Sequence, residues 1–190
     1  MIKPAGQRLL LALLAMIGIV GCLDGVTADE VISGNFELLD HNGQRVTEQS
    51  YAGKLRLVFF GFTRCPDVCP TTLVEVRDAL RLLGDDAAHV QPLFVSVDSD
   101  YDSTQKLANY VAHFHASLVG LSGTTEQIDT AAESFNVTYG VKPAEESSSG
   151  REEIFHTSYL FLMDREGDFL DVFGYGTKAE RIAKTLREYL

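Results

Sequence analysis

The sequence predicts an α/β fold in which a central mixed β-sheet is flanked by helices. Two apolar runs, Leu55–Phe60 and Val90–Val97, have the composition of buried strands, and each precedes a segment with helical periodicity. Buried strands that alternate with helices are typical of a sheet covered on both faces. Two later apolar segments, 157–163 and 168–173, flank a polar turn that ends at Gly167, so they predict a hairpin. This hairpin would add antiparallel strands to the sheet.

A second hairpin is predicted near the N-terminus. Residues 36–40 and 44–47 flank the dipeptide Asn42-Gly43, which readily adopts the positive φ angles of a tight hairpin turn. A short apolar segment at 118–121 supplies one more candidate strand. We expect the N-terminal hairpin to be an extension in front of the first central strand.

Four segments predict helices: Thr71–Leu83, Thr104–Phe114, 124–135 and the C-terminal residues 177–190. Thr124 followed by Gln127 matches a capping box, and Thr177 is a candidate cap of the last helix.

Residues 143–153 are rich in Ser and Glu and predict an exposed loop. The order of elements is a β-hairpin, then β-α-β-α-(β)-α, then β-β-α. This is the layout of a thioredoxin-like fold with an N-terminal extension and one inserted segment.

Length, composition and charge limit the classes of function. A chain of 190 residues with 45% hydrophobic residues is sufficient for one domain with a full core. The net charge of −11 argues against nucleic acid as a partner, because no basic stripe is present to neutralise phosphates. A basic docking surface on a partner protein would suit this acidity better.

The N-terminus has the pattern of an export signal. Lys3 and Arg8 precede the apolar segment Leu9–Val20, which is short for a membrane span. A small residue followed by Cys22 resembles a bacterial lipobox, in which the cysteine is lipidated. We therefore expect a signal at 1–22, a tether at 23–32 and the folded domain at 33–190.

The protein would then be exported and anchored by lipid to a membrane, facing the periplasm or another extracytoplasmic space. An ordinary cleaved signal and a short uncleaved anchor are the alternatives.

Cys65 and Cys69 are the strongest candidates for chemistry. They lie four residues apart, between an apolar strand and a helix, so the turn between these elements can bring their sulfurs together. Two thiolates suit Cu(I), Zn(II) or reversible disulfide formation. The helix N-terminus and Arg64 should favour the thiolate form. A disulfide between them would close too small a loop to stabilise the fold much.

A third ligand must come from elsewhere in the chain. His156 differs from the other four histidines, because it stands at the start of a strand just after the Ser- and Glu-rich loop. From the residues alone, a surface or capping histidine is the favoured interpretation, and a metal ligand is the alternative. His41 is expected in a solvated turn, His89 in a polar connector, and His113 and His115 at a helix end.

Three carboxylates, Asp98, Asp100 and Asp102, follow the second central strand. Sites often lie at the C-terminal ends of parallel strands, and such a cluster could bind a hard cation such as Ca(II). A solvated loop with one residue capping the next helix is the other interpretation, and we favour it.

Three segments together resemble the Sco/SenC family. They are 60–73 (FGFTRCPDVCPTTL), 94–124 (FVSVDSDYDSTQKLANYVAHFHASLVGLSGT) and 155–174 (FHTSYLFLMDREGDFLDVFG), within a similarity that covers about residues 33–190. Proteins of this family are thioredoxin-like, bind copper and serve assembly of the copper centre of cytochrome c oxidase. The resemblance implies that Cys65, Cys69 and His156 hold Cu(I) or Cu(II).

The resemblance also implies a function and partners. The protein would deliver copper to the copper-binding subunit of cytochrome c oxidase, or reduce the cysteines of that subunit, after receiving copper or electrons from an upstream copper donor or thiol reductant. The alternatives are an extracytoplasmic thiol-disulfide oxidoreductase or peroxidase, and a redox or copper sensor. Cys65 and Cys69 would be the redox-active pair in each case. We favour a role other than that of an enzyme, with thiol-disulfide reductase activity as the alternative. One departure is that Ser99 and Ser103 replace the family's usual Pro and Thr.

Overall fold

A computed structural model describes residues 32–147, 150 and 152–190. The predicted signal, tether and lipidated Cys22 lie outside these residues, apart from Ile32. Residues 31–190 cluster as one compact unit. Among the described residues, no helix is both long enough and apolar enough to span a bilayer.

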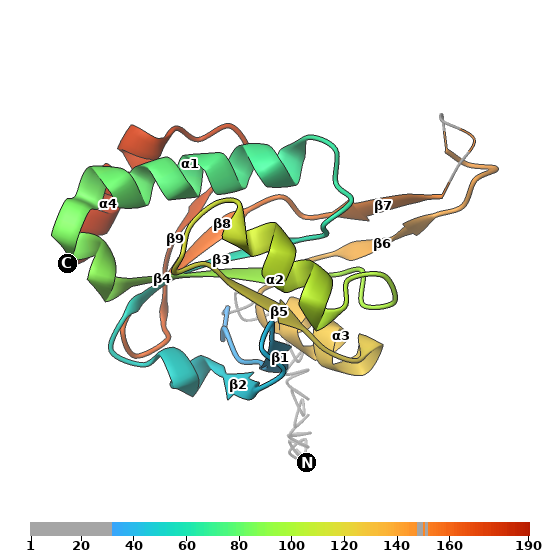
Figure 1. The fold of residues 1–190 in the computed structure, drawn as a ribbon, viewed down its shortest axis with the longest axis horizontal. Helices are drawn as coiled ribbons and strands as arrows, with labels where there is room; N and C mark the ends of the chain where they lie inside the picture. The colour runs from blue at the N-terminus through green and yellow to red at the C-terminus, as the bar shows by residue number, and fades with distance from the viewer. Residues whose placement is uncertain (1–31, 148–149, 151) are drawn as a thin grey trace, which may run out of the picture. The chain divides into compact units, whose positions relative to one another are not determined.

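A seven-stranded mixed sheet forms the centre of this unit (Figure 1). The spatial order of its strands is β2-β1-β5-β4-β3-β8-β9. Strands β3, β4 and β5 are parallel, whereas β8 and β9 continue the sheet antiparallel from β3, and β1 and β2 do so from β5. The bounds of the strands are β1 Glu37–Asp40, β2 Arg45–Thr47, β3 Leu55–Gly61, β4 Val90–Ser96, β5 Val119–Ser122, β8 Leu160–Met163 and β9 Phe169–Phe173.

In the described ranges, four α-helices cover the sheet: α1 Val68–Leu83, α2 Thr104–Ala112, α3 Thr125–Ser134 and α4 Ala179–Tyr189. Short 3-10 helices occupy Glu48–Tyr51 and Gly84–His89. The mixed sheet, the flanking helices and the N-terminal hairpin were all predicted. The turn of that hairpin contains Gly43 at φ 81°, as expected for the Asn-Gly pair.

Two neighbouring residues of β3, Phe59 and Phe60, pack on opposite faces of the sheet. Phe59 packs toward Phe94, whose ring lies 5.4 Å from Tyr110 of α2. Phe60 points to the opposite face, because successive strand residues alternate, and its ring lies 5.3 Å from Phe135 at the end of α3. All seven residues of β3 are buried, as the apolar run predicted.

The predicted exposed loop at 143–153 is part of a third hairpin. Strands β6 (Tyr139–Lys142) and β7 (Glu153–His156) pair antiparallel, and they extend away from the main sheet (Figure 1). The later strand was expected from residue 157, but β8 begins at Leu160. His156 therefore ends a strand of its own and does not open the strand of the main sheet.

Two helices begin differently from the prediction. Helix α1 begins at Val68 instead of Thr71, which is possible because Pro70 lies in the first turn, where amides have no intrahelical acceptor. Thr124 and Gln127 form the predicted capping box. Thr177 does not cap α4, however. The Glu75 carboxylate of α1 accepts from the Ala179 amide at 2.8 Å instead.

Candidate metal centre

The C-terminal end of β3 leads directly into both cysteines. Cys65 lies in the loop 62–67 and is half-buried, whereas Cys69 lies in the first turn of α1 and is fully buried. Gly61 makes room for the Cys69 sulfur, because a Cβ at this position would lie 2.8 Å from that Sγ and 2.8 Å from a Phe94 ring carbon. The strand end thus has to be glycine for the helix to bring Cys69 so close.

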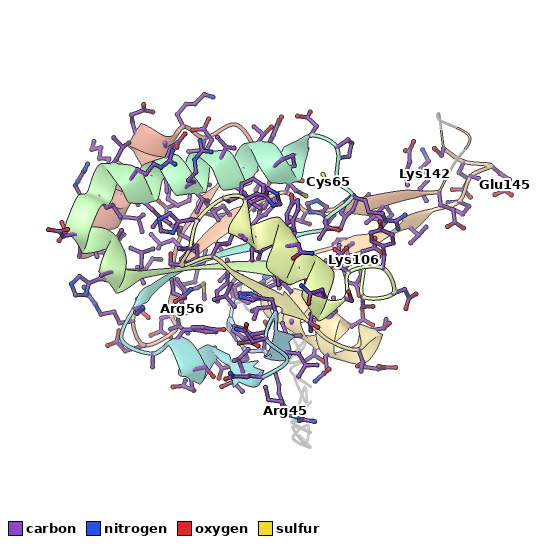
Figure 2. The ribbon with its side chains drawn as sticks, in the orientation of Figure 1. Arg45, Arg56, Cys65, Lys106, Lys142 and Glu145 are labelled. Carbon is purple, nitrogen blue, oxygen red and sulfur yellow. The ribbon has the colours of Figure 1, made fainter. Side chains whose placement is uncertain are left out.

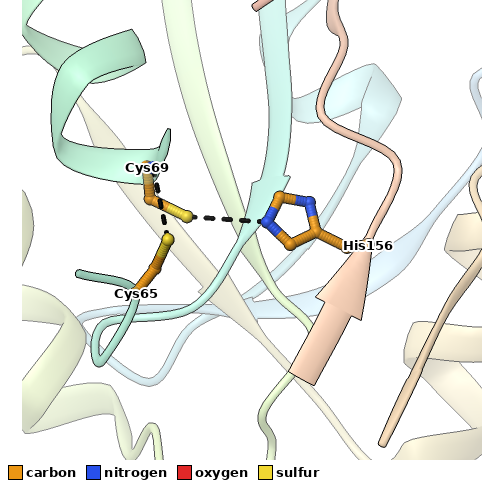
Figure 3. Close-up of side chains that lie close together, drawn as sticks. All are labelled: Cys65, Cys69 and His156. Carbon is orange, nitrogen blue, oxygen red and sulfur yellow. Dashed lines mark hydrogen bonds between the residues drawn. The ribbon is translucent and has the colours of Figure 1, made fainter. Parts of the chain in front are cut away.

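His156 approaches the cysteines from the separate hairpin (Figure 3). Its ring makes edge contacts with Phe59 and Phe62, with centroid distances of 5.9 and 5.8 Å. His156 Nδ1 lies 3.0 Å from the Thr157 carbonyl, and Nε2 lies 3.7 Å from Cys69 Sγ. Since a carbonyl can only accept, Nδ1 carries the proton and the lone pair of Nε2 faces the sulfurs.

Cys65, Cys69 and His156 therefore form one donor group, with all ligand atoms within 4.8 Å of one another. Two sulfurs and one imidazole nitrogen suit a soft or borderline ion such as copper or zinc, and they do not suit Ca(II) or Mg(II). The group is incomplete as a structural zinc site, which normally has four protein ligands. The donor set thus fits an ion that stays open to a further ligand.

The two thiols differ strongly in acidity. The pKa of Cys65 falls to about 4, mainly because the Cys69 thiol donates to its sulfur. The Cys69 amide, in the first turn of α1, also points at Cys65 Sγ at 3.4 Å. The same contact with Cys65 and the burial of its own sulfur raise the pKa of Cys69. Cys65 is therefore the thiolate and Cys69 the thiol.

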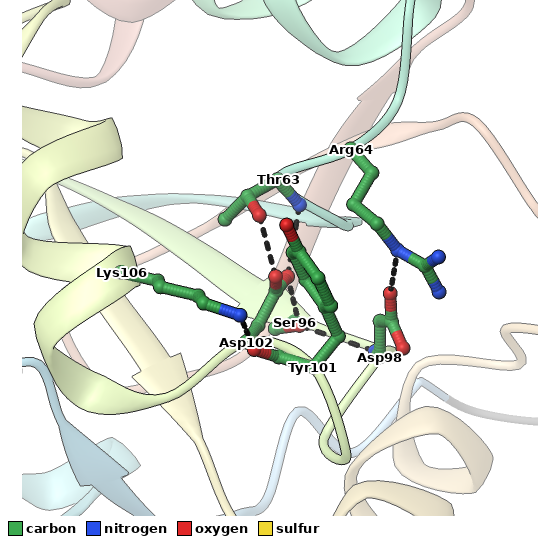
Figure 4. Close-up of polar contacts among 7 residues, drawn as sticks. All are labelled: Thr63, Arg64, Ser96, Asp98, Tyr101, Asp102 and Lys106. Atoms are coloured by element: carbon green, nitrogen blue, oxygen red, sulfur yellow. Dashed lines mark hydrogen bonds and ion pairs between the residues drawn. The ribbon is translucent and has the colours of Figure 1, made fainter.

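Arg64 does not support the thiolate, contrary to the prediction. Its Nε donates to the Asp98 carboxylate at 2.8 Å, and its guanidinium lies 4.5 Å from the centroid of the Tyr101 ring (Figure 4). The expected support from the helix N-terminus comes from the Cys69 amide, which donates to Cys65 Sγ. Arg64 instead contacts the loop after β4.

The acidic loop after β4 is not the solvated loop that we favoured. Asp102 is completely buried, and its carboxylate accepts from the Thr63 amide at 2.8 Å, the Thr63 hydroxyl and the Ser96 hydroxyl at 2.7 Å (Figure 4). Ser103, and not an aspartate, caps α2. Sequence reasoning missed this role, because the partners of Asp102 lie in other segments of the chain. Only Asp100 is exposed as expected.

The other histidines lie outside the group. His41 was expected to be solvated, but its Nδ1 accepts from the Gly120 amide at 3.0 Å and joins the N-terminal hairpin to β5. His113 is exposed at the end of α2, with Nδ1 2.6 Å from the Asn109 carbonyl. His115 is half-buried, which lowers its pKa, and His89 is exposed.

The difference in acidity predicts selective alkylation. At pH 6, iodoacetamide should modify Cys65 and leave Cys69 unmodified, because the pKa of Cys65 is about 4 and that of the buried Cys69 is raised. Peptide mass mapping of the reduced, metal-free protein measures this, and urea-unfolded protein at the same pH is the control. Equal labelling of the two cysteines in the folded protein would contradict the assignment.

The buried carboxylate predicts that Asp102→Asn loosens the loop of Cys65. An asparagine amide would turn a donor toward groups that all donate to Asp102, so we expect a loss of about 2 to 3 kcal/mol in the free energy of unfolding. Urea denaturation measures the loss, and Asp100→Asn removes a charge from the exposed part of the same loop as the matched control. An unchanged stability of Asp102→Asn would refute the role of this carboxylate.

Comparisons with known proteins agree with this architecture. The family model SCO1/SenC matches residues 25–190. The human mitochondrial SCO1 homolog is 36% identical over 166 residues, which cover 84% of this chain and 53% of the human protein. The chain spans about half to six tenths of the length of the curated relatives that it matches first.

Two solved structures are similar over the same region. Bradyrhizobium japonicum ScoI with copper bound is 40% identical, with a TM-score of 0.74 over 83% of this chain and 99% of that one. Arabidopsis thaliana ScoI with copper bound is 32% identical, with a TM-score of 0.76 over 83% of this chain and 97% of that one. The predicted thioredoxin-like fold is confirmed, and the chain belongs to the SCO1/SenC family.

Proposed function

We propose that this protein is a copper-binding metallochaperone. In this role, it delivers copper to the copper-binding subunit of cytochrome c oxidase or reduces the cysteines of that subunit. The observation that carries the proposal is the donor group of Cys65, Cys69 and His156, which lie within 4.8 Å of one another. The copper-bound structures of two related proteins support the choice of copper over zinc.

The donor group suits temporary rather than permanent binding. Two thiolates favour Cu(I), and the imidazole also accommodates Cu(II). His156 belongs to the two-stranded hairpin, whereas both cysteines are attached to β3 and α1. The third ligand can therefore separate from the sulfurs without disturbing the main sheet, which would open the ion to a receiving protein.

Copper binding and thiol oxidation exclude each other at this site. If Cys65 and Cys69 pass two electrons to a disulfide of a partner protein, an S–S bond forms between them, and the partner disulfide becomes two thiols. Both sulfur ligands are then lost to the ion. The loading of copper is thus coupled to the redox state of the pair.

A thiol-disulfide oxidoreductase is the second candidate. The low pKa of Cys65 beside the protonated Cys69 is the arrangement of an attacking thiolate next to a resolving thiol. This activity does not need His156, so the histidine separates the two candidates.

Metal titration of the reduced protein tests the proposal. We expect about one copper per chain, loss of binding in Cys65→Ala, and Cu(II) binding weakened about tenfold or more in His156→Ala, since one of three donors is removed. His113→Ala is the matched control, because this exposed histidine lies outside the donor group. Copper analysis after gel filtration and a competing chelator give stoichiometry and affinity.

The opposite result would favour the oxidoreductase. If the wild-type protein does not bind copper, and the wild type and His156→Ala reduce disulfides at equal rates, the protein is not a copper chaperone. Loss of oxidase activity in a deletion strain, with rescue by added copper, would separate delivery from sensing.

The proposed location is a membrane surface outside the cytoplasm. The pattern of Lys3, Arg8, Leu9–Val20 and Cys22 supports an export signal that ends at a lipidated cysteine, followed by a tether and the domain at 33–190.

We expect Cys22→Ser to move the protein from the membrane fraction to the soluble supernatant of spheroplasts. Fractionation with immunoblotting measures this, and Cys69→Ser is the control for loss of a cysteine as such. Retention of Cys22→Ser in the membrane would refute the lipid anchor.

A further inference from the structure

A cleft of about 380 Å³ lies beside the donor group and has no role in holding the ion. One wall is the loop of Cys65 and the other is β7, and the lining residues are Phe62, Arg64, Pro66, Glu152, Glu153 and Ile154. Cys65 is placed between Arg64 and Pro66 in the chain, so the cleft runs past this ligand. Its lining combines three apolar side chains with three charged ones, as ligand-binding clefts often do.

The wall formed by β7 is a strand edge. Within the part of the chain that the structure describes, only β6 pairs with β7, and the lining of the cleft includes β7 and no residue of β6. The Thr157 amide donates to the Thr138 carbonyl at 2.8 Å, so residue 157 forms a hydrogen-bonded pair with β6. Because such pairs alternate along an antiparallel ladder, the N–H and C=O of Ile154 turn to the other edge of β7. This edge faces the cleft.

The charges of the cleft favour a basic occupant. Glu152 is exposed on the β7 side, whereas Arg64 on the opposite side is already paired with Asp98 at 2.8 Å. The whole chain carries a net charge of −11. A cationic side chain in the cleft would therefore be attracted both locally and at a distance.

We propose that this cleft binds an extended segment of the protein that receives the copper, which adds to β7 as a further strand. The segment would carry an apolar side chain that lies among Phe62, Pro66 and Ile154, and a neighbouring Lys or Arg that faces Glu152. This inference rests on the proposed function, because it names how the receiving partner is recognised. Pairing at a strand edge supplies affinity, and the side-chain contacts supply selectivity.

Docking along this edge of β7 brings the partner to the ion. The segment would run between β7, which ends at the ligand His156, and the loop that contains the ligand Cys65. A cysteine, histidine or methionine of the partner near the end of the segment could then reach the copper. Recognition and transfer would occur at the same edge of the donor group.

A dye-labelled peptide of alternating lysine and valine tests this proposal with the full-length, reduced protein in detergent. Fluorescence anisotropy should show saturable binding that weakens with salt. Glu152→Lys should weaken it about threefold or more, because one attractive charge becomes repulsive. Ile154→Pro should weaken binding about tenfold, because proline removes the amide that would pair with the peptide. The β6–β7 hairpin should persist, since this amide does not pair with β6.

The matched control is Glu145→Lys. It makes the same change of charge at the outer end of the hairpin, away from Cys65 (Figure 2), and should leave the affinity unchanged. A peptide with N-methyl groups on its backbone keeps the charges but cannot pair as a strand, so it should not bind. A glutamate-valine peptide should not bind either.

Three outcomes would overturn the proposal: no binding of the lysine-valine peptide, equal binding of its N-methylated form, or equal losses in Glu152→Lys and Glu145→Lys. Self-association that Ile154→Pro abolishes, without peptide binding, would assign the edge to a second copy of this chain instead. Copper stoichiometry is measured on the same samples. A protein that binds copper but not the peptide refutes the docking alone, whereas a protein that binds no copper refutes the proposed function.

Discussion

The buried carboxylate of Asp102 is the contact on which the donor group depends. Strands β3 and β4 are parallel, so the segments that follow them leave the sheet at the same edge, and the Val97 amide donates to the Gly61 carbonyl at 2.8 Å. Asp102 then joins both segments through Thr63 and Ser96. Burial of a carboxylate costs several kcal/mol, and charge-assisted hydrogen bonds of about 1.5 to 3 kcal/mol each offset this cost. The net gain in stability is small, but the position of the Cys65 loop is fixed.

The site joins two parts of the fold that are attached in different ways. The cysteines follow a fully buried strand and lie against Gly61 and Phe94, so a change in their separation would disturb the core. His156 lies on a two-stranded hairpin, which is marginally stable by itself and gains support from ring contacts with Phe59 and Phe62. A firm pair of sulfurs with a separately attached imidazole suits the proposed release of the ion to a partner.

The sequence was informative where structure is local and uninformative where it depends on distant segments. The buried strands, the Asn-Gly hairpin and the capping box of Thr124 follow from neighbouring residues, and the structure confirms them. The pair β6–β7 was missed, because Gly140 interrupts β6 and a Ser- and Glu-rich segment separates the strands. Gly140 is explained only by the folded hairpin, where a Cβ would lie 2.8 Å from the Phe155 ring. Burial of Asp102 could not be predicted either, since its partner Thr63 lies 39 residues away.

The route by which copper would leave follows from the unequal burial of the ligands. Transfer between proteins without release of the free ion requires a ligand of the receiver to bind before the last donor ligand dissociates. Cys69 is fully buried in the first turn of α1 and therefore cannot meet a partner, whereas Cys65 is half-buried at the cleft and His156 is attached through β7. An incoming ligand would approach on the side of Cys65 and His156, and Cys69 would release the ion last. Cys65 is then the first sulfur to be exchanged, because it is the more exposed of the two cysteines.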